Sequence, residues 1–434
     1  MGNKLMNMNR AEKIDHDPGR MLAILDDVMA QRSALHHSLL ENQAVMLAAL
    51  SALNGNAPLL QISMPEPAPL FTRRQLEEFA NGSVAACFGP DYAILDQRKT
   101  PRIPNGRLLL IDRVVEISGQ RRNPQPPAAI TSQVDIPADA WYLREEGYPQ
   151  VPLAILMEMA LQPCGILSAY VGTSLVIPPE NNLFRNLDGS LRFADMPDLR
   201  GKTVTNAAQL TRSFSSGGLT IQAYNFALSV DGKSFLSGES SFGYFTPATM
   251  EKQSGLDGRE KRAMLIENAD LPLTFRPLGT SAVGGTRGLL DLVDQTWFDP
   301  RGGRFGKGVI LGQKDLQPDE WFYSNHFYQD PVMPGSLGVE AIARSLWQYL
   351  RQEFPHIDPA ATTLSFAGKE ALSWKYRGQV LPHNQRTYFE IHIKDIDRTG
   401  HMPVIRADAD FWVDGLRIYA IENLNMTLKE SNKR

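Results

Sequence analysis

The sequence predicts an α+β protein built from one module used twice. Each copy is a long central helix wrapped by an antiparallel sheet, and the two copies pair as a pseudo-dimer. Short β-like runs bounded by Gly, Pro, Ser or Asp fill two stretches of the chain, and each stretch holds one long apolar helical passage. Landmarks of the first stretch recur in the second at a nearly constant spacing, which indicates a duplication.

Four landmarks occur in the same order in both stretches, between 180 and 183 residues apart. They are Gly106–Asp112 with Gly288–Asp294, Asp135 and Trp141 with Asp315 and Trp321, Pro152 and Glu158 with Pro334 and Glu340, and Val230–Gly232 with Val413–Gly415. The central helices are predicted over 152–171 and 334–350. Each begins at a proline, whose missing N–H costs least in the first helical turn.

The domain boundaries follow from changes in composition along the 434 residues, a length that suits two to three domains. Residues 1–66 are predicted to be an appendage, with an amphipathic helix over 20–53 and a Pro-rich linker after it. The first module is predicted over 67–250 and the second over 271–434. The charged stretch 251–270 is predicted to connect them.

Composition excludes several classes of protein. The formal net charge is -4 and no basic block occurs, so a nucleic-acid partner is not expected. The longest apolar stretch, 151–171, contains Glu158, Gln162 and Pro163, and it is predicted to be a buried helix that does not cross a membrane. The N-terminus has no apolar signal core, and two cysteines do not suggest a disulfide framework. We expect a cytoplasmic protein.

Histidine placement separates the two modules. The eight histidines lie at positions 16, 36, 37, 326, 356, 383, 392 and 401, so the first module cannot supply a histidine base. His326 precedes Pro334 and Gly335, which begin the second helix, and the free N–H groups of a helix N-terminus suit a developing oxyanion. The residues alone leave a catalytic and a structural role for His326 open. Surface positions are expected for the other histidines, and no metal site is expected.

Glu158 is unusual because it lies within the most apolar helix of the chain, in the sequence LAILMEMAL. A buried, unpaired carboxylate is costly, so Glu158 is expected to have a raised pKa or a polar partner, and either property marks a candidate functional site. A solvent-facing position at the helix end is the alternative. Gln162 lies four residues further on, and therefore on the same face of the helix.

The segment around His326, NHFYQDPVMPGSLGVEA, resembles the active-site segment of the FabA-like bacterial 3-hydroxyacyl-acyl-carrier-protein dehydratases. The resemblance includes PLFTRRQLEEFANG, RLLLIDRVVEI and the two VDG turns, and it covers roughly residues 67 to 430. The passage VPLAILMEMALQPCGILSAYVG is similar to dehydratase regions of bacterial polyunsaturated fatty acid synthases, which carry double-hotdog units. The resemblance implies a tandem hotdog fold, in which each sheet wraps one long helix.

In that family the histidine acts with a carboxylate from the central helix of the opposite hotdog. The resemblance therefore pairs His326 with Glu158, whereas Glu340 faces a first copy that has Arg144 in the histidine region. The first copy has Pro152-Leu153 where the second has Pro334-Gly335, and the family's helix glutamine falls on Gln162, where the second copy has Arg344. We expect one composite site with His326 and Glu158 as catalytic residues. Substrate binding is assigned to Gly335, Gln162, Pro334 and Ser336.

The resemblance implies removal of water from a 3-hydroxyacyl thioester to give a trans-2-enoyl thioester. His326 would remove the α-proton, Glu158 would protonate the leaving hydroxyl, and the Gly335 N–H would bind the thioester oxygen. No metal or organic cofactor is expected, because the acyl chain is carried on the phosphopantetheine of acyl carrier protein. Other synthase domains or subunits are expected partners, and a homodimer is left open, as are elimination stereochemistry and double-bond isomerisation.

Two other functions remain open from the sequence. A hotdog acyl thioesterase would use similar groups to activate water for attack on the thioester. A non-catalytic hotdog would only bind carrier protein or a neighbouring enzyme, although the presence of His326 with Pro334 and Gly335 argues against it.

Overall fold

The computed structural model divides the chain into two compact units, Met1–Glu66 and Pro67–Arg434. All of the residues that the structure describes belong to the second unit: 68–144, 151–216, 218–258, 262–267, 276–279, 288–357, 362–366, 370–400 and 402–430. The predicted helix at 20–53, its linker and His401 lie outside the described residues. The predicted domain boundaries remain predictions.

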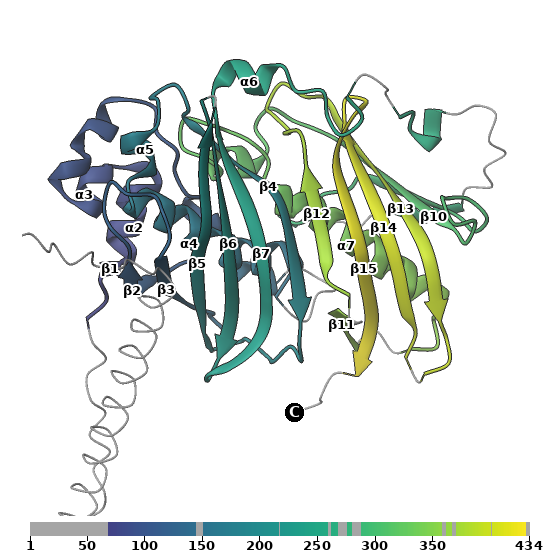
Figure 1. The fold of residues 1–434 in the computed structure, drawn as a ribbon. Helices are drawn as coiled ribbons and strands as arrows, with labels where there is room; N and C mark the ends of the chain where they lie inside the picture. The colour runs from purple at the N-terminus through teal and green to yellow at the C-terminus, as the bar shows by residue number, and fades with distance from the viewer. Residues whose placement is uncertain are drawn as a thin grey trace, which may run out of the picture. The chain divides into compact units, whose positions relative to one another are not determined.

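The strands of the described residues form one continuous antiparallel sheet (Figure 1). Seven belong to the first half of the unit: β1 (Phe71–Thr72), β2 (Arg113–Ser118), β3 (Ala128–Asp135), β4 (Leu183–Phe193), β5 (Thr203–Ser216), β6 (Leu219–Val230) and β7 (Lys233–Phe245). Eight belong to the second half: β8 (Arg276–Gly279), β9 (Gln295–Asp299), β10 (Val309–Asp315), β11 (Thr362–Phe366), β12 (Leu372–Tyr376), β13 (Arg386–Asp397), β14 (Val404–Val413) and β15 (Leu416–Glu430).

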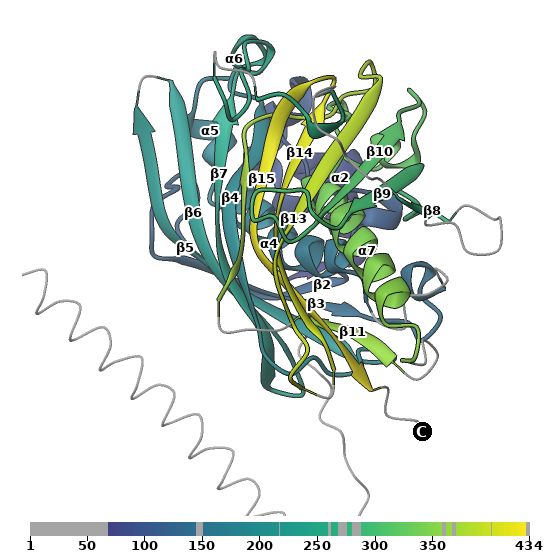
Figure 2. The ribbon, with the colours of Figure 1, turned by 90° about the vertical axis from the view of Figure 1, so that its right-hand side faces the viewer.

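Two long helices cover the inner side of this sheet (Figure 2). They are α4 (Leu153–Tyr170), which packs on β3, β5 and β6, and α7 (Gly335–Glu353), which packs on β10, β13 and β15. The two helices also pack against each other, so they share one hydrophobic core. The shorter helices are α2 (Arg73–Asn81), α3 (Val84–Phe88), α5 (Thr173–Val176) and α6 (Pro247–Glu251).

The order of the strands has the twofold character that the duplication predicts. From its edge inwards the first half runs β1-β2-β3-β5-β6-β7-β4, and the second runs β8-β9-β10-β13-β14-β15-β12. The halves join where β4 pairs with β12, with Ser190 opposite Ser373. The matched residues Trp141 and Trp321 meet edge to face, with ring centroids 5.7 Å apart. The structure confirms the predicted tandem hotdog that pairs as a pseudo-dimer.

The composition of α4 follows from its surroundings. It begins directly after Pro152, and most of its side chains are buried, so an apolar surface on every side suits it. The segment Leu153–Val176 is long and apolar enough to cross a membrane by length and composition alone. Of its apolar stretch of 18 residues, 78% is buried inside the structure. The burial of α4 agrees with the buried helix predicted over 151–171.

One histidine contradicts its prediction. His356 and His383 are exposed as expected, but His392 is completely buried, so the expected surface position is wrong. Its neighbours Ile391 and Ile393 face the core, so His392 points to the outer face of β13. There, residues of the connector contact the sheet, since the backbone N–H of Leu265 donates a hydrogen bond of 2.6 Å to Glu390. A cover of this kind cannot be inferred from strand alternation.

Candidate active site

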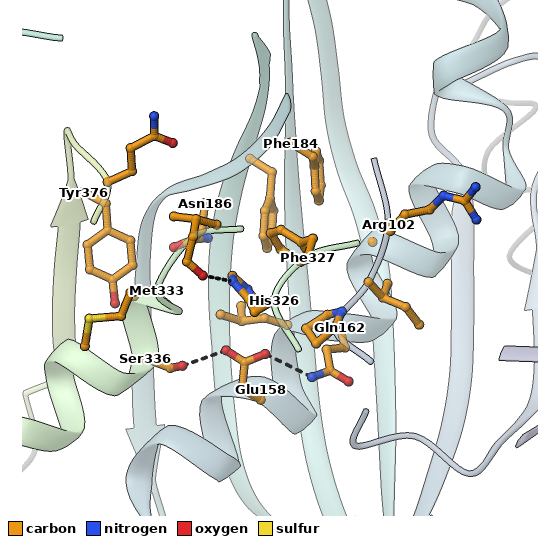
Figure 3. A pocket seen from close by; sticks show the side chains of 18 of the residues that line it. Arg102, Glu158, Gln162, Phe184, Asn186, His326, Phe327, Met333, Ser336 and Tyr376 are labelled. Atoms are coloured by element: carbon orange, nitrogen blue, oxygen red, sulfur yellow. Dashed lines mark hydrogen bonds between the residues drawn. The ribbon is translucent and has the colours of Figure 1, made fainter. Parts of the chain in front are cut away.

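A cavity of about 110 Å³ is lined by both halves of the protein (Figure 3). Of the residues predicted to form the site, it brings together His326, Glu158, Gln162, Gly335 and Ser336. Pro334 does not line the cavity and instead immediately precedes the first residue of α7. The remaining lining residues are mostly apolar or aromatic: Arg102, Ile103, Pro104, Leu161, Gly165, Phe184, Asn186, Phe242, Phe327, Val332, Met333, Tyr376, Gly378, Gln379 and Tyr419.

His326 lies in a turn that is closed by two contacts between His326 and Val332. Its backbone carbonyl accepts a hydrogen bond from the N–H of Val332 at 2.8 Å, and its Nδ1 lies 2.9 Å from the carbonyl oxygen of Val332. A carbonyl oxygen can only accept, so Nδ1 carries the proton of the neutral ring and Nε2 has the lone pair. This tautomer makes Nε2 the nitrogen that can act as a base.

The first half holds this turn in place at two points. On one side, the carbonyl oxygen of Asn325 accepts a hydrogen bond of 2.8 Å from the N–H of Asn105, and its side-chain oxygen accepts one of 3.0 Å from the N–H of Arg107. On the other side, Asp330 accepts two hydrogen bonds from the Arg185 guanidinium, at 2.7 and 2.9 Å. The histidine of the second half is thus positioned by residues of the first.

Burial determines the protonation state of His326. Its ring is removed from solvent, and the resulting desolvation lowers its pKa from 6.5 to about 4. The hydrogen bond to Val332 opposes this shift without reversing it. His326 is therefore neutral near pH 7, as a general base must be.

Glu158 is buried, as one of the two sequence hypotheses required, and it has two neutral partners. Its Oε1 accepts a hydrogen bond of 2.6 Å from the Ser336 hydroxyl, and its Oε2 accepts one of 3.0 Å from the Gln162 amide. Desolvation raises the pKa of Glu158, and these two hydrogen bonds only partly oppose it. The carboxyl group is thus biased toward its protonated form, which can donate a proton.

Gln162 orients this carboxyl group. Its side-chain oxygen accepts a hydrogen bond of 2.9 Å from the N–H of Leu110, and its amide nitrogen donates one of 2.7 Å to the carbonyl oxygen of Leu108. These contacts fix the amide so that its nitrogen faces Glu158. The structure therefore shows Gln162 as a partner of Glu158, a relation that their i, i+4 spacing indicated.

The N-terminus of α7 completes the site. Gly335 is the first residue of the helix, and the first N–H groups of a helix have no partner within it. A Cβ on Gly335 would lie 2.6 Å from Cε2 of Tyr376, so no larger residue fits there. The second half has glycine at position 335 where the first half has Leu153. The packing of Tyr376 is a reason for this glycine, in addition to the expected approach of a ligand to the backbone.

The equivalent place in the other half has a different arrangement. Glu340 is completely buried, and its carboxylate accepts hydrogen bonds from the N–H of Ala154 at 3.0 Å and from Nε of Arg344 at 3.1 Å. Arg144, in the region of the first half that corresponds to the His326 segment, is exposed and pairs with Asp139. Glu340 thus contacts the N-terminus of α4 and a cation, with no histidine at the matching position.

Three other groups lie at metal-ligand distances from one another, Glu390, His392 and Asp410. Asp410 already accepts hydrogen bonds from Arg262, Arg304 and Arg417. Nδ1 of His392 accepts a hydrogen bond of 3.3 Å from the backbone N–H of Arg304, so in the neutral ring the proton lies on Nε2, which faces the carboxylates. This cluster fits an ion-pair network better than a metal centre.

The sequence matches one family model and a curated relative. Residues 286–422 match the family model of the FabA-like domain. A polyunsaturated fatty acid synthase subunit from Thraustochytrium sp. is 32% identical over 426 aligned positions, which cover 88% of this chain and 27% of that protein. The chain therefore spans about a quarter of the length of this curated relative.

Two solved structures match the chain at low similarity. An acyl-ACP thioesterase from Bacteroides thetaiotaomicron is 10% identical, with 69% of this chain and 98% of that chain covered and a TM-score of 0.37. A bifunctional dehydratase-cyclase domain in ambruticin biosynthesis is 13% identical, with 73% and 95% covered and a TM-score of 0.36.

The chain thus contains a FabA-like hotdog dehydratase domain, and the predicted family is confirmed. Over most of its length it is homologous to part of a polyunsaturated fatty acid synthase subunit.

Proposed function

We propose that this protein removes water from 3-hydroxyacyl thioesters to give trans-2-enoyl thioesters. The observation that carries the proposal is a cavity lined by one buried neutral histidine, one buried carboxyl group biased toward protonation, and the N-terminus of a helix. These are the base, the acid and the oxyanion site that β-elimination next to a thioester requires.

The proposed reaction moves two protons in opposite directions. Nε2 of His326 takes the α-proton from C2 while the thioester oxygen gains negative charge near the Gly335 N–H. The electron pair then forms the C2–C3 double bond, the C3–O bond breaks, and Glu158 donates its proton so that water leaves. The enzyme is left with a protonated His326 and an ionised Glu158, and return of the proton from histidine to carboxylate restores the starting state.

The surroundings of each group support its proposed role. A base is most useful when it is unprotonated at the working pH, and the lowered pKa of His326 provides this. An acid must retain its proton until the hydroxyl leaves, and the upward shift of the Glu158 pKa favours this. Gln162 and Ser336 keep the carboxyl group oriented throughout.

The biological setting is part of the proposal. The homology to a polyunsaturated fatty acid synthase subunit supports a role in fatty acid or polyunsaturated fatty acid synthesis. We propose acyl carrier protein as the carrier of the substrate, other synthase domains or subunits as partners, and the cytoplasm as the location.

Incubation of the full chain with 3-hydroxyacyl thioesters on pantetheine and on carrier protein tests the proposal, with mass spectrometry as the readout. We expect loss of one water from the intact thioester, and reversible addition of water to the enoyl product. Release of a free acid would instead identify a thioesterase. No change in either thioester would favour a protein that only binds the carrier.

A further inference from the structure

Tyr376 is a buried tyrosine of the cavity whose hydroxyl has no hydrogen-bond partner among the described residues. Its side chain is only 6% exposed, and its ring packs on that of Tyr419, with centroids 4.4 Å apart. A buried hydroxyl without a partner costs about 1 to 3 kcal/mol. Because Tyr376 lines the cavity, a molecule bound there is the natural source of the missing partner.

The position of the ring places this hydroxyl beside the helix N-terminus. Relative to the point where a Cβ of Gly335 would lie, Cε2 of Tyr376 is 2.6 Å away and Cζ, which bears the hydroxyl, is 2.9 Å away. The phenol ring thus packs against Gly335, the first residue of α7. Figure 3 shows the Tyr376 hydroxyl directed toward the side of the cavity where Ser336 and Glu158 lie.

The duplication shows that the hydroxyl belongs to one half only. Tyr376 ends β12 and Phe193 ends β4, and the two lie 183 residues apart, the same spacing as the VDG turns. Phe193 has no hydroxyl, and its ring stacks on Phe366 with centroids 4.2 Å apart. The second half therefore has both Gly335 and Tyr376, whereas the first half has Leu153 and Phe193 at the matching positions.

We infer that the Tyr376 hydroxyl donates a hydrogen bond to the thioester oxygen of the acyl substrate, as a second donor beside the Gly335 N–H. The inference rests on the proposed function and adds a catalytic residue to it. The leaving hydroxyl is assigned to Glu158, whereas the thioester oxygen otherwise has the Gly335 N–H alone. Burial raises the pKa of Tyr376 well above 10, so the phenol stays neutral and can donate.

A binding cycle tests the inference without turnover. The full chain and the variant Tyr376→Phe are titrated with S-hexanoyl pantetheine and with S-hexyl pantetheine, a thioether that lacks the carbonyl oxygen. Neither ligand has a 3-hydroxyl group to eliminate. We expect the wild-type chain to prefer the thioester, and this preference to fall about 3- to 10-fold in Tyr376→Phe, as for loss of one hydrogen bond.

The matched control is Tyr349→Phe, which removes a hydroxyl from a buried tyrosine of α7 that does not line the cavity. This change should leave the preference for the thioester unaltered. The thermal midpoint supplies a second readout. Because the Tyr376 hydroxyl has no partner among the described residues, Tyr376→Phe should unfold at the same or a higher temperature than the wild type.

Each outcome of the experiment decides a separate point. An unchanged preference in Tyr376→Phe, with binding intact, would overturn the role of the phenol and leave the proposed function standing. A thermal midpoint several degrees lower would show that the hydroxyl has a structural partner, and would also overturn the inference. Failure of the wild-type chain to prefer the thioester over the thioether would also overturn the inference, whereas the proposed function is decided separately by turnover of 3-hydroxyacyl thioesters.

Discussion

The two central helices carry a glutamate at the same position but place it in different surroundings. Glu158 has only neutral partners, the hydroxyl of Ser336 and the amide of Gln162, and it lines a cavity together with His326. Glu340 is paired with a guanidinium and a helix N-terminus. With only neutral partners, desolvation raises the pKa of Glu158, and its two hydrogen bonds oppose the shift only in part.

This difference suggests how a duplicated module acquires one site rather than two. In a symmetric pair, both glutamates would face a histidine and a glycine-started helix. Here the second half has His326 and Gly335, and the first half has Glu158 and Gln162. The place left without a histidine has a buried ion pair within α7, and Glu340 of this pair also accepts a hydrogen bond from Ala154 of α4. On the proposed function, one of the two equivalent places carries the chemistry and the other contributes structural support.

Removal of the proposed base or acid should have the largest effect. We expect His326→Ala and Glu158→Gln each to lower kcat by about 10² to 10⁴, since a positioned acid or base typically contributes that much. Steady-state rates with a 3-hydroxyacyl thioester measure this, with circular dichroism as the control for folding. Near-normal turnover in either folded variant would remove that residue from the mechanism.

At the equivalent place the same change should act on stability. Glu340→Gln weakens a buried ion pair, so we expect it to cost about 3 kcal/mol of unfolding free energy while the folded fraction retains its kcat. Denaturant titration and single-turnover rates separate the two quantities. A loss of kcat equal to that of Glu158→Gln would erase the distinction between the two glutamates.

The contact between the halves that holds the histidine turn should have an intermediate effect. Asp330→Asn weakens the bidentate contact with Arg185, so the His326 turn should be less well positioned and kcat should fall about tenfold. The matched control is Asp198→Asn, which weakens an exposed ion pair with Arg200 and should leave kcat unchanged. Equal effects of the two changes would argue against positioning.

The pH dependence should report the two shifted groups. Activity should persist down to about pH 4 and fall below it as His326 gains a proton, while at high pH it should fall as Glu158 loses its proton. Between pH 6.5 and about 4 the unfolded chain protonates this histidine and the folded chain does not. Its contribution to stability is therefore lost as pH falls, by up to about 1.4 kcal/mol per pH unit.

Thermal melts of the wild type and His326→Gln over this pH range check the stability part of that prediction. The variant should show the shallower dependence, because it lacks the group that takes up the proton. An acid limb of kcat/KM near pH 6.5 would mean that His326 is solvated during catalysis.

Much of the fold could be predicted because its signals are local or periodic. Two prolines mark the starts of α4 and α7, strand alternation marks the sheet, and a constant spacing reveals the duplication. Some polar residues of the cavity are unusual in their sequence context, as Glu158 is within an apolar helix. Such unusual residues can be recognised from the amino-acid sequence alone.

Other features depend on contacts between distant segments, which no local pattern encodes. Asp330 and Arg185 are 145 residues apart in sequence, and the Asn325 contact reaches across more than half of the described chain to Arg107. In the sequence, Tyr376 resembles any aromatic residue of a buried strand, and only the structure shows that its ring packs against Gly335. His392 was misassigned because its cover comes from the connector and the segment around Arg304.

A pair of double-mutant cycles tests the composite site most directly. If His326 and Glu158 act as a unit, His326→Ala/Glu158→Gln should be scarcely slower than the slower single variant. His326→Ala combined with Glu340→Gln should show the His326→Ala rate, with the stability loss of Glu340→Gln added to it. Rate effects that multiply for His326 with Glu158, together with non-additive effects for His326 with Glu340, would show that the site is built with the other glutamate.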